Sequence, residues 1–497
     1  TLKQVYRSLW AHTQVHLKTT YTARTKYPQN KIIVPIDWLV THGSLDECSQ
    51  ADGILKAVLA SGQEPQTGQV LSFPQQKVPL AQPFRAFIKE VMETQKFPER
   101  HYMPGGELIK PYDITSWSLP LHRGISSFKI DEVVDALENS LQKVEFPIEF
   151  QGEHSEGIKS IVFSVTNNES YKVAFAAMSQ GLEISRVTKT FNVQGIEIKK
   201  GDFVFMPTDK NSEKMHPLFE GLSVNPVTLT EKMEANLETL ALPKIALIET
   251  NFHDMDAGWT RYIFDTYKIP FTVVQPGEVQ GQDLSDFDVI VFPDNNKSVL
   301  LEGKYKGSDN TYNIPSLDPK YSKGIEKEGV QKLMKFVNEG GTIVSWGLST
   351  GLFFGPQSIK ISEKEKEEFQ LPISDISPAL NKKGLYAPGS LLNINLNVDH
   401  PLTLGMQKTA KVFSRGRPVF STSIPYFDTD RRVIASYPDD KVLSSGYAAQ
   451  DELLENKSAM VWVKKGKGQF VFYGFYPQFR ASTSGTYKLL FNALLLK

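Results

Sequence analysis

The stretch KIALIETNFHDMDAGWTRYIFDTYKIPFTVVQPGEVQGQDLSDFDVIVFPD, residues 244 to 294, decides the fold class of this chain. Its middle places Trp259, Tyr262, Ile263 and Tyr267 on one face of a helix. The apolar runs KIALIE, FTVVQ and DVIVFPD flank that helix and are typical of buried strands. Strand, helix, strand, strand opens a doubly wound α/β domain, in which ligand sites lie beyond the carboxyl ends of the strands. The turn NFHDMD therefore faces any cleft.

The same pattern continues to the end of the chain. GVQKLMKFVNEGG predicts a helix that ends at Gly340 and Gly341, and TIVSW predicts a buried strand after it. AMVWV and QFVFYGF indicate a hairpin, and TYKLLFNALLL indicates a terminal helix. The charged run between Ser362 and Phe369 predicts a solvated helix. Residues 243–497 are thus expected to form a doubly wound α/β domain with an open, mainly parallel sheet and helices on both faces.

Two smaller α/β units are expected before this domain, over residues 28–125 and 126–242. KSIVFSV and ESYKVAFAAMSQGLEI in the second unit resemble KIIVPID and ADGILKAVLASGQEPQ in the first, which indicates a divergent internal repeat. The alternative is that any two strand–helix–strand units look alike at this level. Residues 1–27 have helical spacing and are interpreted as a helical linker from an upstream domain that this chain lacks.

Composition excludes several classes of partner. A net charge of −1 gives no field that would gather nucleic acid. No run of about eighteen apolar residues exists, so no membrane span is predicted. The single cysteine, Cys48, excludes an internal disulfide framework.

Several separate blocks resemble the non-catalytic region of large bacterial zinc carboxypeptidases of the carboxypeptidase A-like class. These blocks are LAQPFRAFIKEVME, PYDITSWSLPL, DMDAGWTRYIFDTYKIPFT, DHPLTLGM and FYGFYPQFRASTSGTYKLLFNALL. The resemblance implies an accessory region that follows a metallopeptidase domain and ends in a flavodoxin-like, class I glutamine amidotransferase-like domain. It also implies an exported protein, periplasmic or extracellular, whose main partner is the upstream peptidase domain. Zinc is expected only in that peptidase domain, and no cofactor is expected in this chain.

The histidine spacing predicts that this chain holds no catalytic zinc. The resembling enzymes bind zinc through a His-x-x-Glu pair and a later histidine, and none of the nine histidines here has a glutamate three residues on. The amidotransferase triad is also absent. The resemblance implies a cysteine at a strand-to-helix elbow, where SWGLSTG offers only Ser345 and Ser349, and a late His-Pro-Glu, where Tyr476 and Gln478 flank a proline. No catalytic residue is therefore predicted.

A ligand site is nevertheless predicted at the carboxyl edge of the sheet. The first strand delivers the NFHDMD turn there, the strand TIVSW delivers SWGLSTG, and the last strand delivers GFYPQFR. The candidate residues are His253, Asp254, Asp256, Ser349, Tyr476, Gln478 and Arg480. Carboxylates, an arginine and aromatic faces suit a peptide end or sugar hydroxyls. The alternative is that these groups satisfy one another and cap the strands.

Arginines beside aromatic residues recur in SRGRP, residues 414 to 418, and in PQFR, which ends at Arg480. Such arginines can recognise carboxylates, although they more often pin loops. We therefore expect the chain to bind or position rather than to catalyse. The alternative is a hydrolase or carbohydrate-binding domain that uses a new site in the C-terminal α/β domain.

Overall fold

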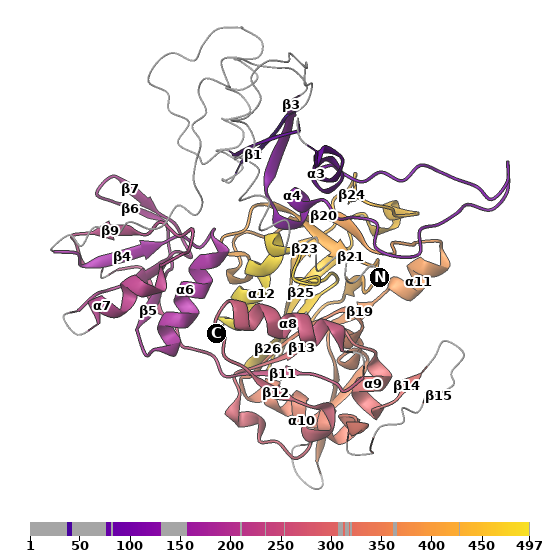
Figure 1. The fold of residues 1–497 in the computed structure, drawn as a ribbon. Coiled ribbons are helices and arrows are strands. Elements are labelled where there is room, and N and C mark those ends of the chain that lie inside the picture. Colours follow the sequence, from indigo (N-terminus) through magenta and orange to yellow (C-terminus); the bar gives the residue numbers. More distant parts are fainter. Residues whose placement is uncertain are drawn as a thin grey trace, which may run out of the picture. The chain divides into compact units, whose positions relative to one another are not determined.

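The chain is a mixed α/β protein in a computed structural model (Figure 1). The structure describes residues 37–41, 76–80, 83–130, 157–208, 211–233, 235–252, 254–306, 312–313, 318, 321–360, 365–426 and 428–496. The predicted linker at 1–27, Cys48 and His253 lie outside these residues. Two compact units are present, Thr1–Ile88 with Ser126–His154 and Phe219–Ser223, and Lys89–Ile125 with Ser155–Leu218 and Val224–Lys497. Domain boundaries at 27, 125 and 242 stay a prediction.

The first unit contains a small antiparallel sheet. Its central strand β1 (Asp37–Thr41) pairs with β2 (Gln76–Pro79) on one side and β3 (Ser126–Ile130) on the other. Helix α3 (Arg85–Met92) begins in this unit, within the block LAQPFRAFIKEVME.

The second unit contains a five-stranded sheet in the order β10-β5-β8-β4-β9, in which all neighbours are antiparallel. Strand β4 (Ser160–Phe163) leads into helix α6 (Asn168–Ser179) and then to β5 (Ile184–Val187), and β8 (Phe203–Phe205) lies between the two strands. The helix begins where the Asn167 side chain accepts the Glu169 amide. The edges are β9 (Val227–Leu229) and β10 (Leu237–Thr239), and β6 (Phe191–Val193) and β7 (Ile196–Ile198) form a hairpin.

The large sheet of this unit has a parallel half of five strands, in the order β12-β11-β13-β16-β26. These strands are β12 (Thr272–Val274), β11 (Ile245–Ile248), β13 (Val289–Phe292), β16 (Thr342–Trp346) and β26 (Gly468–Tyr473). Four of them are buried at every residue, as expected when helices cover both faces of a sheet. The predicted strands at 244–249, 342–346 and 469–475 are thereby confirmed in position.

Helices pack on the two faces of the parallel half. On one face Ile290, Ile343 and Phe470 form a core with Leu333 and Val337 of α10 (Glu326–Glu339). Helices α8 (Met255–Thr266) and α12 (Tyr487–Leu494) lie side by side (Figure 1). The centres of the Tyr267 and Phe491 rings, at the end of α8 and within α12, are 4.7 Å apart. Helices therefore pack against the parallel strands, and the flavodoxin-like class of this domain stays a prediction.

The other half of this sheet is antiparallel, so the expectation of a mainly parallel sheet is correct only for the first half. From β26 the order continues through β25 (Ser458–Lys465), β23 (Thr429–Ser436), β20 (Ser390–Leu396) and β21 (Thr409–Ser414). The predicted hairpin is β25 and β26. Shorter elements of this unit are α4 (Leu119–Arg123), α7 (Ser212–Met215), α9 (Lys297–Glu302), β14 (Tyr305–Lys306), β15 (Tyr312–Asn313), β19 (Ile373–Asp375), α11 (Ser377–Lys382), β22 (Phe420–Thr422) and β24 (Leu443–Ser445).

The helix predicted between Ser362 and Phe369 is wrong. Residues Lys366–Gln370 form strand β18, which pairs with β17 (Pro356–Lys360). Exposure alternates along β18, and Glu367 and Phe369 lie on its less exposed face. Phe369 packs against the core, and Glu367 accepts a hydrogen bond from the buried Lys465 at 2.6 Å. Tertiary contacts at every second residue thus override the helical preference of a Glu- and Lys-rich run. Nowhere in the described part of the chain does a helix combine the length and apolar character that a bilayer crossing needs.

Candidate functional site

Asp254 caps the helix that follows the first parallel strand. Its carboxylate accepts the Ala257 amide at 3.1 Å and the Thr250 amide at 2.7 Å, which ties the end of the β11 turn to the start of α8. Burial raises the pKa of Asp254 to about 6, although the hydrogen bonds from these two amides act to lower it. The predicted candidate is therefore a structural cap whose oxygens are both engaged.

Asp256 lies at the centre of a hydrogen-bond network. One carboxylate oxygen accepts the Trp346 indole N–H and the Asp294 amide at 3.0 Å, and the other accepts the Gln478 side-chain N–H at 3.1 Å. Burial of the carboxyl group, and then the charge of Asp294, raise the pKa of Asp256 to about 8, although part of the residue surface stays exposed. These donors come from three other strand ends, so Asp256 joins β11, β13, β16 and β26 at one edge.

Asp294 and Tyr476 form the second centre of this network. The Tyr476 hydroxyl donates to one oxygen of Asp294 at 2.7 Å, and the Leu348 amide donates to the other at 2.7 Å. Burial, reinforced by the charge of Asp294, holds the pKa of Tyr476 well above its usual range. Sequence reasoning missed Asp294 as a site residue, although it ends the predicted strand DVIVFPD, and that position was the available signal.

Gly347 makes room for Asp294. Its φ of +63° lies in the left-handed region, and a Cβ there would lie 2.1 Å from an Asp294 carboxylate oxygen. Trp346, whose indole binds Asp256, directly precedes this glycine at the end of β16. The sequence offered no signal for the role of Trp346, because its partner lies 90 residues away.

Ser349 is a closed structural group rather than an exposed hydroxyl. Its side chain is fully buried, donates to the Pro293 carbonyl and accepts the Asn295 amide at 2.8 Å. Asn295 in turn donates to the Thr250 hydroxyl at 3.1 Å, which links Ser349 to the Asp254 turn. The Ser349 hydroxyl is thus occupied in both directions.

Gln478 is fully buried between the last strand and α8. Its side-chain N–H groups reach the Asp256 carboxylate, the Asp256 carbonyl at 3.2 Å and the Thr260 hydroxyl at 3.0 Å. Its side-chain oxygen has no partner among the described residues. Gln478 is held by the helix start and cannot face a ligand without a rearrangement.

Arg480 lies beside this network rather than in it. Its backbone φ of +48° is left-handed, and its guanidinium lies 5.1 Å from the centre of the Phe479 ring. The structure therefore brings together five of the seven candidates, Asp254, Asp256, Ser349, Tyr476 and Gln478, and places Arg480 at their border. Whether these residues bind a ligand stays a prediction.

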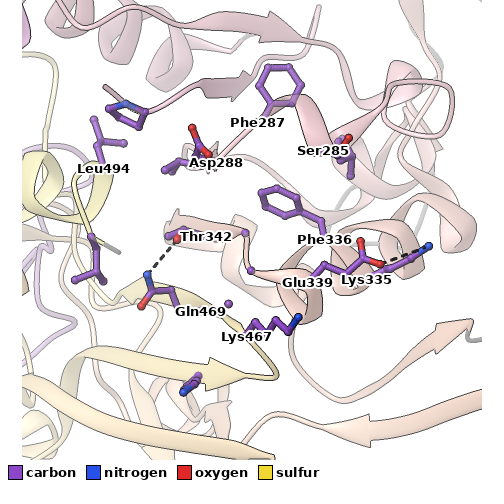
Figure 2. A pocket seen from close by; sticks show the side chains of 18 of the residues that line it. Ser285, Phe287, Asp288, Lys335, Phe336, Glu339, Thr342, Lys467, Gln469 and Leu494 are labelled. Carbon is purple, nitrogen blue, oxygen red and sulfur yellow. Dashed lines mark hydrogen bonds and ion pairs between the residues drawn. The ribbon is translucent and has the colours of Figure 1, made fainter. Parts of the chain in front are cut away.

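A separate cavity lies at the opposite edge of the parallel strands. It has a volume of about 840 Å³ and is lined by the first residues of β13, β16 and β26, including Thr342 and Gly468. Figure 2 shows the Phe287 and Phe336 rings at this cavity, with the Gln469 side chain bonded to Thr342. Parallel α/β sheets usually place ligands at the carboxyl edge, so this amino-edge cavity was not expected.

No group of three or more His, Cys, Asp or Glu side chains within the described ranges is arranged to hold a metal ion. The absence of zinc from this chain stays a prediction, to be tested by metal analysis.

Comparisons with known proteins leave the family open. No family model and no curated protein sequence matches the chain. Among solved structures, a β-galactosidase from Bacillus circulans sp. alkalophilus is similar at 13% identity and a TM-score of 0.26, over 50% of this chain and 30% of that chain. A putative GMP synthase protein from Thermoplasma acidophilum is similar at 10% identity and a TM-score of 0.28, over 51% of this chain and 92% of that chain.

A glutamine amidotransferase from Thermotoga maritima is similar at 10% identity and a TM-score of 0.24, over 48% of this chain and 76% of that chain. Amidotransferases are thus among the structural neighbours of part of the chain. The chain spans less than a third of the length of the galactosidases it matches. These TM-scores are too low to assign the chain to a family. The carboxypeptidase resemblance rests on the sequence blocks alone.

Proposed function

We propose that this chain is a non-catalytic accessory region of an exported zinc carboxypeptidase-like protein, which binds or positions the upstream peptidase domain. Residues 243–497 would form its flavodoxin-like, class I glutamine amidotransferase-like domain. Support for that domain type comes from the parallel order β12-β11-β13-β16-β26, which in chain order reads 2-1-3-4-5. The sequence blocks quoted above support the peptidase parent.

The closed network at the carboxyl edge carries the proposal that the chain does not catalyse. A nucleophile there would need a free hydroxyl or thiol and a nearby base. Ser349 is buried and bonded in both directions, while Tyr476 and Gln478 are bonded to Asp294 and Asp256. A tyrosine with a raised pKa and a neutral amide cannot take a proton at neutral pH. The side chains therefore stabilise the strand ends.

Reactivity is the test of this part. The purified chain and its Ser349→Ala variant would be treated with a fluorophosphonate probe and assayed for hydrolysis of glutamine and of aryl esters. We expect no labelled serine and equal background rates for both proteins. A labelled Ser349, or an activity that the variant loses, would show that the network opens and that the chain is an enzyme.

The accessory role has a separate test. The reading frame upstream of residue 1 should encode a domain with a His-x-x-Glu zinc pair. That domain, produced separately, should co-elute with this chain in size-exclusion chromatography. A coding sequence without such a domain, or two proteins that elute independently, would refute the accessory role.

Carbohydrate binding is the second candidate, and the amino-edge cavity favours it. Its volume of about 840 Å³ lies in the range of ligand sites, and Phe287, Phe336 and Trp462 contribute aromatic rings to its lining. Sugars commonly stack on such rings with their hydroxyls on neighbouring polar groups. Titration with a panel of oligosaccharides, using Phe287→Ala as the comparison variant, would show binding that the variant weakens. Identical titrations for both proteins would exclude the cavity as the sugar site.

A further inference from the structure

We propose that Arg415 and Arg480 form a carboxylate-binding subsite at the border of the carboxyl-edge network. The proposal rests on the non-catalytic binding role proposed above and names the chemistry of the ligand. It has three supports: a rigid aromatic cluster, a strained backbone at Arg480, and two arginines that the described protein leaves without an anionic partner.

The aromatic cluster consists of Phe413, Tyr476 and Phe479. Phe413 stacks on Phe479 with 3.6 Å between ring centres, and it meets the Tyr476 ring edge-on at 5.9 Å. The Tyr476 amide also donates to the Phe413 carbonyl at 2.9 Å, which joins the end of β21 to the chain after β26. All three side chains are buried. The cluster therefore fixes the two chain segments that carry the arginines.

Arg480 has a backbone conformation that a residue with a Cβ rarely adopts. It and Ala481 are both left-handed, with φ values of +48° and +55°. Two bonds hold this turn: the Phe479 amide donates to the Thr483 hydroxyl at 2.9 Å, and the Ser482 amide donates to the Phe479 carbonyl at 2.8 Å. Backbone strain of this kind concentrates at functional sites, because the surrounding structure must maintain it. Glycine would adopt this conformation with less backbone strain, so the conformation of the turn does not explain the arginine side chain.

Arg415 approaches the same cluster from the other segment. It follows the last residue of β21 and is half-buried, and its charge acts on the Tyr476 hydroxyl group. Within the described part of the chain, neither Arg415 nor Arg480 makes an ion pair or a side-chain hydrogen bond, and the Arg480 guanidinium lies over the face of the Phe479 ring. Asp294, the carboxylate that Tyr476 binds, already accepts the Tyr476 hydroxyl and the Leu348 amide.

The ligand that suits this arrangement is a carboxylate. A guanidinium group presents a planar fork that binds both oxygens of a carboxylate, and stacking on a ring holds that fork in one orientation. Half-buried arginines without an internal partner leave that capacity for an external anion. A peptide C-terminus and an acidic sugar share this group, and the assay below separates them.

The test is isothermal titration of the whole chain with four small probes. N-acetyl-alanyl-alanine is compared with its C-terminal amide, and glucuronate is compared with glucose. We expect at least one acid to bind at least tenfold more tightly than its neutral counterpart, with an affinity that falls as salt is added. The acid that binds identifies the source of the carboxylate. Equal affinities within both pairs, or no binding by either acid, would overturn the proposal.

Variants locate the subsite. Arg415→Gln and Arg480→Gln should each weaken binding of the acid at least tenfold, while Arg432→Gln, at an exposed arginine paired with Asp430, should leave it unchanged. Arg480→Gly separates binding from folding. It removes the guanidinium and relieves the left-handed strain, so it should lose the acid while keeping an unfolding midpoint at or above that of the wild type.

Three results would overturn the subsite: an unchanged affinity in Arg415→Gln and Arg480→Gln, an equal loss in Arg432→Gln, or a lowered midpoint in Arg480→Gly, which would mean that the arginine only pins the loop. The labelling and co-elution experiments do not depend on Arg415 or Arg480. A failure of the subsite would therefore leave the accessory role standing.

Discussion

Replacing Asp256 with asparagine should remove a pH-dependent loss of stability. Burial and the charge of Asp294 raise the pKa of Asp256 to about 8 from its ordinary value of 3.8. The folded protein therefore holds a proton that the unfolded chain has already released. A carboxyl group of this kind stabilises the fold fully below pH 4, and that stability is lost as the pH rises toward 8. Asparagine does not ionise, so the Asp256→Asn variant should lack this loss.

The magnitude follows from the size of the shift. One proton bound only in the folded state changes the free energy of unfolding by about 1.4 kcal/mol per pH unit, or about 4 kcal/mol between pH 5 and pH 8. Part of the Asp256 surface is exposed, and solvent screening reduces the effect. We therefore expect the stability of the wild type relative to Asp256→Asn to fall by about 2 kcal/mol across this range.

The assay is urea unfolding of both proteins at pH 5, 6, 7 and 8, followed by tryptophan fluorescence. Asp265→Asn is the matched control, because Asp265 lies on the same helix α8 and is exposed. Asp254 has a raised pKa as well, and its own titration contributes to the curves of all three proteins. A stability difference between wild type and Asp256→Asn that stays constant with pH, or that grows in favour of the wild type, would refute the assignment of Asp256 as a buried, proton-retaining carboxyl group.

Three further changes test the carboxyl-edge network and the packing of the last helix. Ser349→Ala should lower the free energy of unfolding by about 1–3 kcal/mol in urea titrations, because it leaves a buried carbonyl and amide unpaired, and an unchanged stability would mean that the hydroxyl is dispensable. Gly347→Ala should cost clearly more than Gly355→Ala, since both glycines are left-handed but only a Cβ at 347 meets a carboxylate, and equal thermal midpoints would contradict that clash. Asn492→Ala should lower the free energy of unfolding by about 2–4 kcal/mol, because the Asn492 side chain binds two side chains and two carbonyls in the core. The control Asn395→Ala, at an exposed asparagine, should change the stability little. Equal losses of stability in the two variants, measured by calorimetry, would count against this role of Asn492.

The parallel half of the large sheet could be predicted from the sequence because its signals are local. KIALIE, DVIVFPD and TIVSW are short apolar runs, and the apolar residues in the segments between them recur at helical spacing. The structure places all three runs in adjacent parallel strands. The antiparallel half was less visible, since its pairings join strands such as β20 and β23 through long connections that a pattern of neighbouring residues does not record.

The candidate site was predictable only as a set of strand ends. Asp256, Ser349 and Gln478 each follow a predicted strand, and parallel strands bring their carboxyl ends to one edge. The sequence did not show which of these groups form hydrogen bonds with one another. Asp256 binds Trp346 and Gln478 across 90 and 222 residues, and those contacts depend on register and side-chain rotamers. The alternative interpretation, in which these groups satisfy one another, describes most of what the structure shows.

The position of β26 has a consequence for how the protein is made. This strand comes from residues 468–473, yet it lies between β16 and β25, so it joins the parallel and antiparallel halves of the sheet. Among the strands of this sheet, β26 is the last to be synthesised. Until then, the edge of β16 that pairs with β26 stays open to other strands. Folding of this sheet must therefore be late, and nascent or truncated chains should need a chaperone to prevent aggregation.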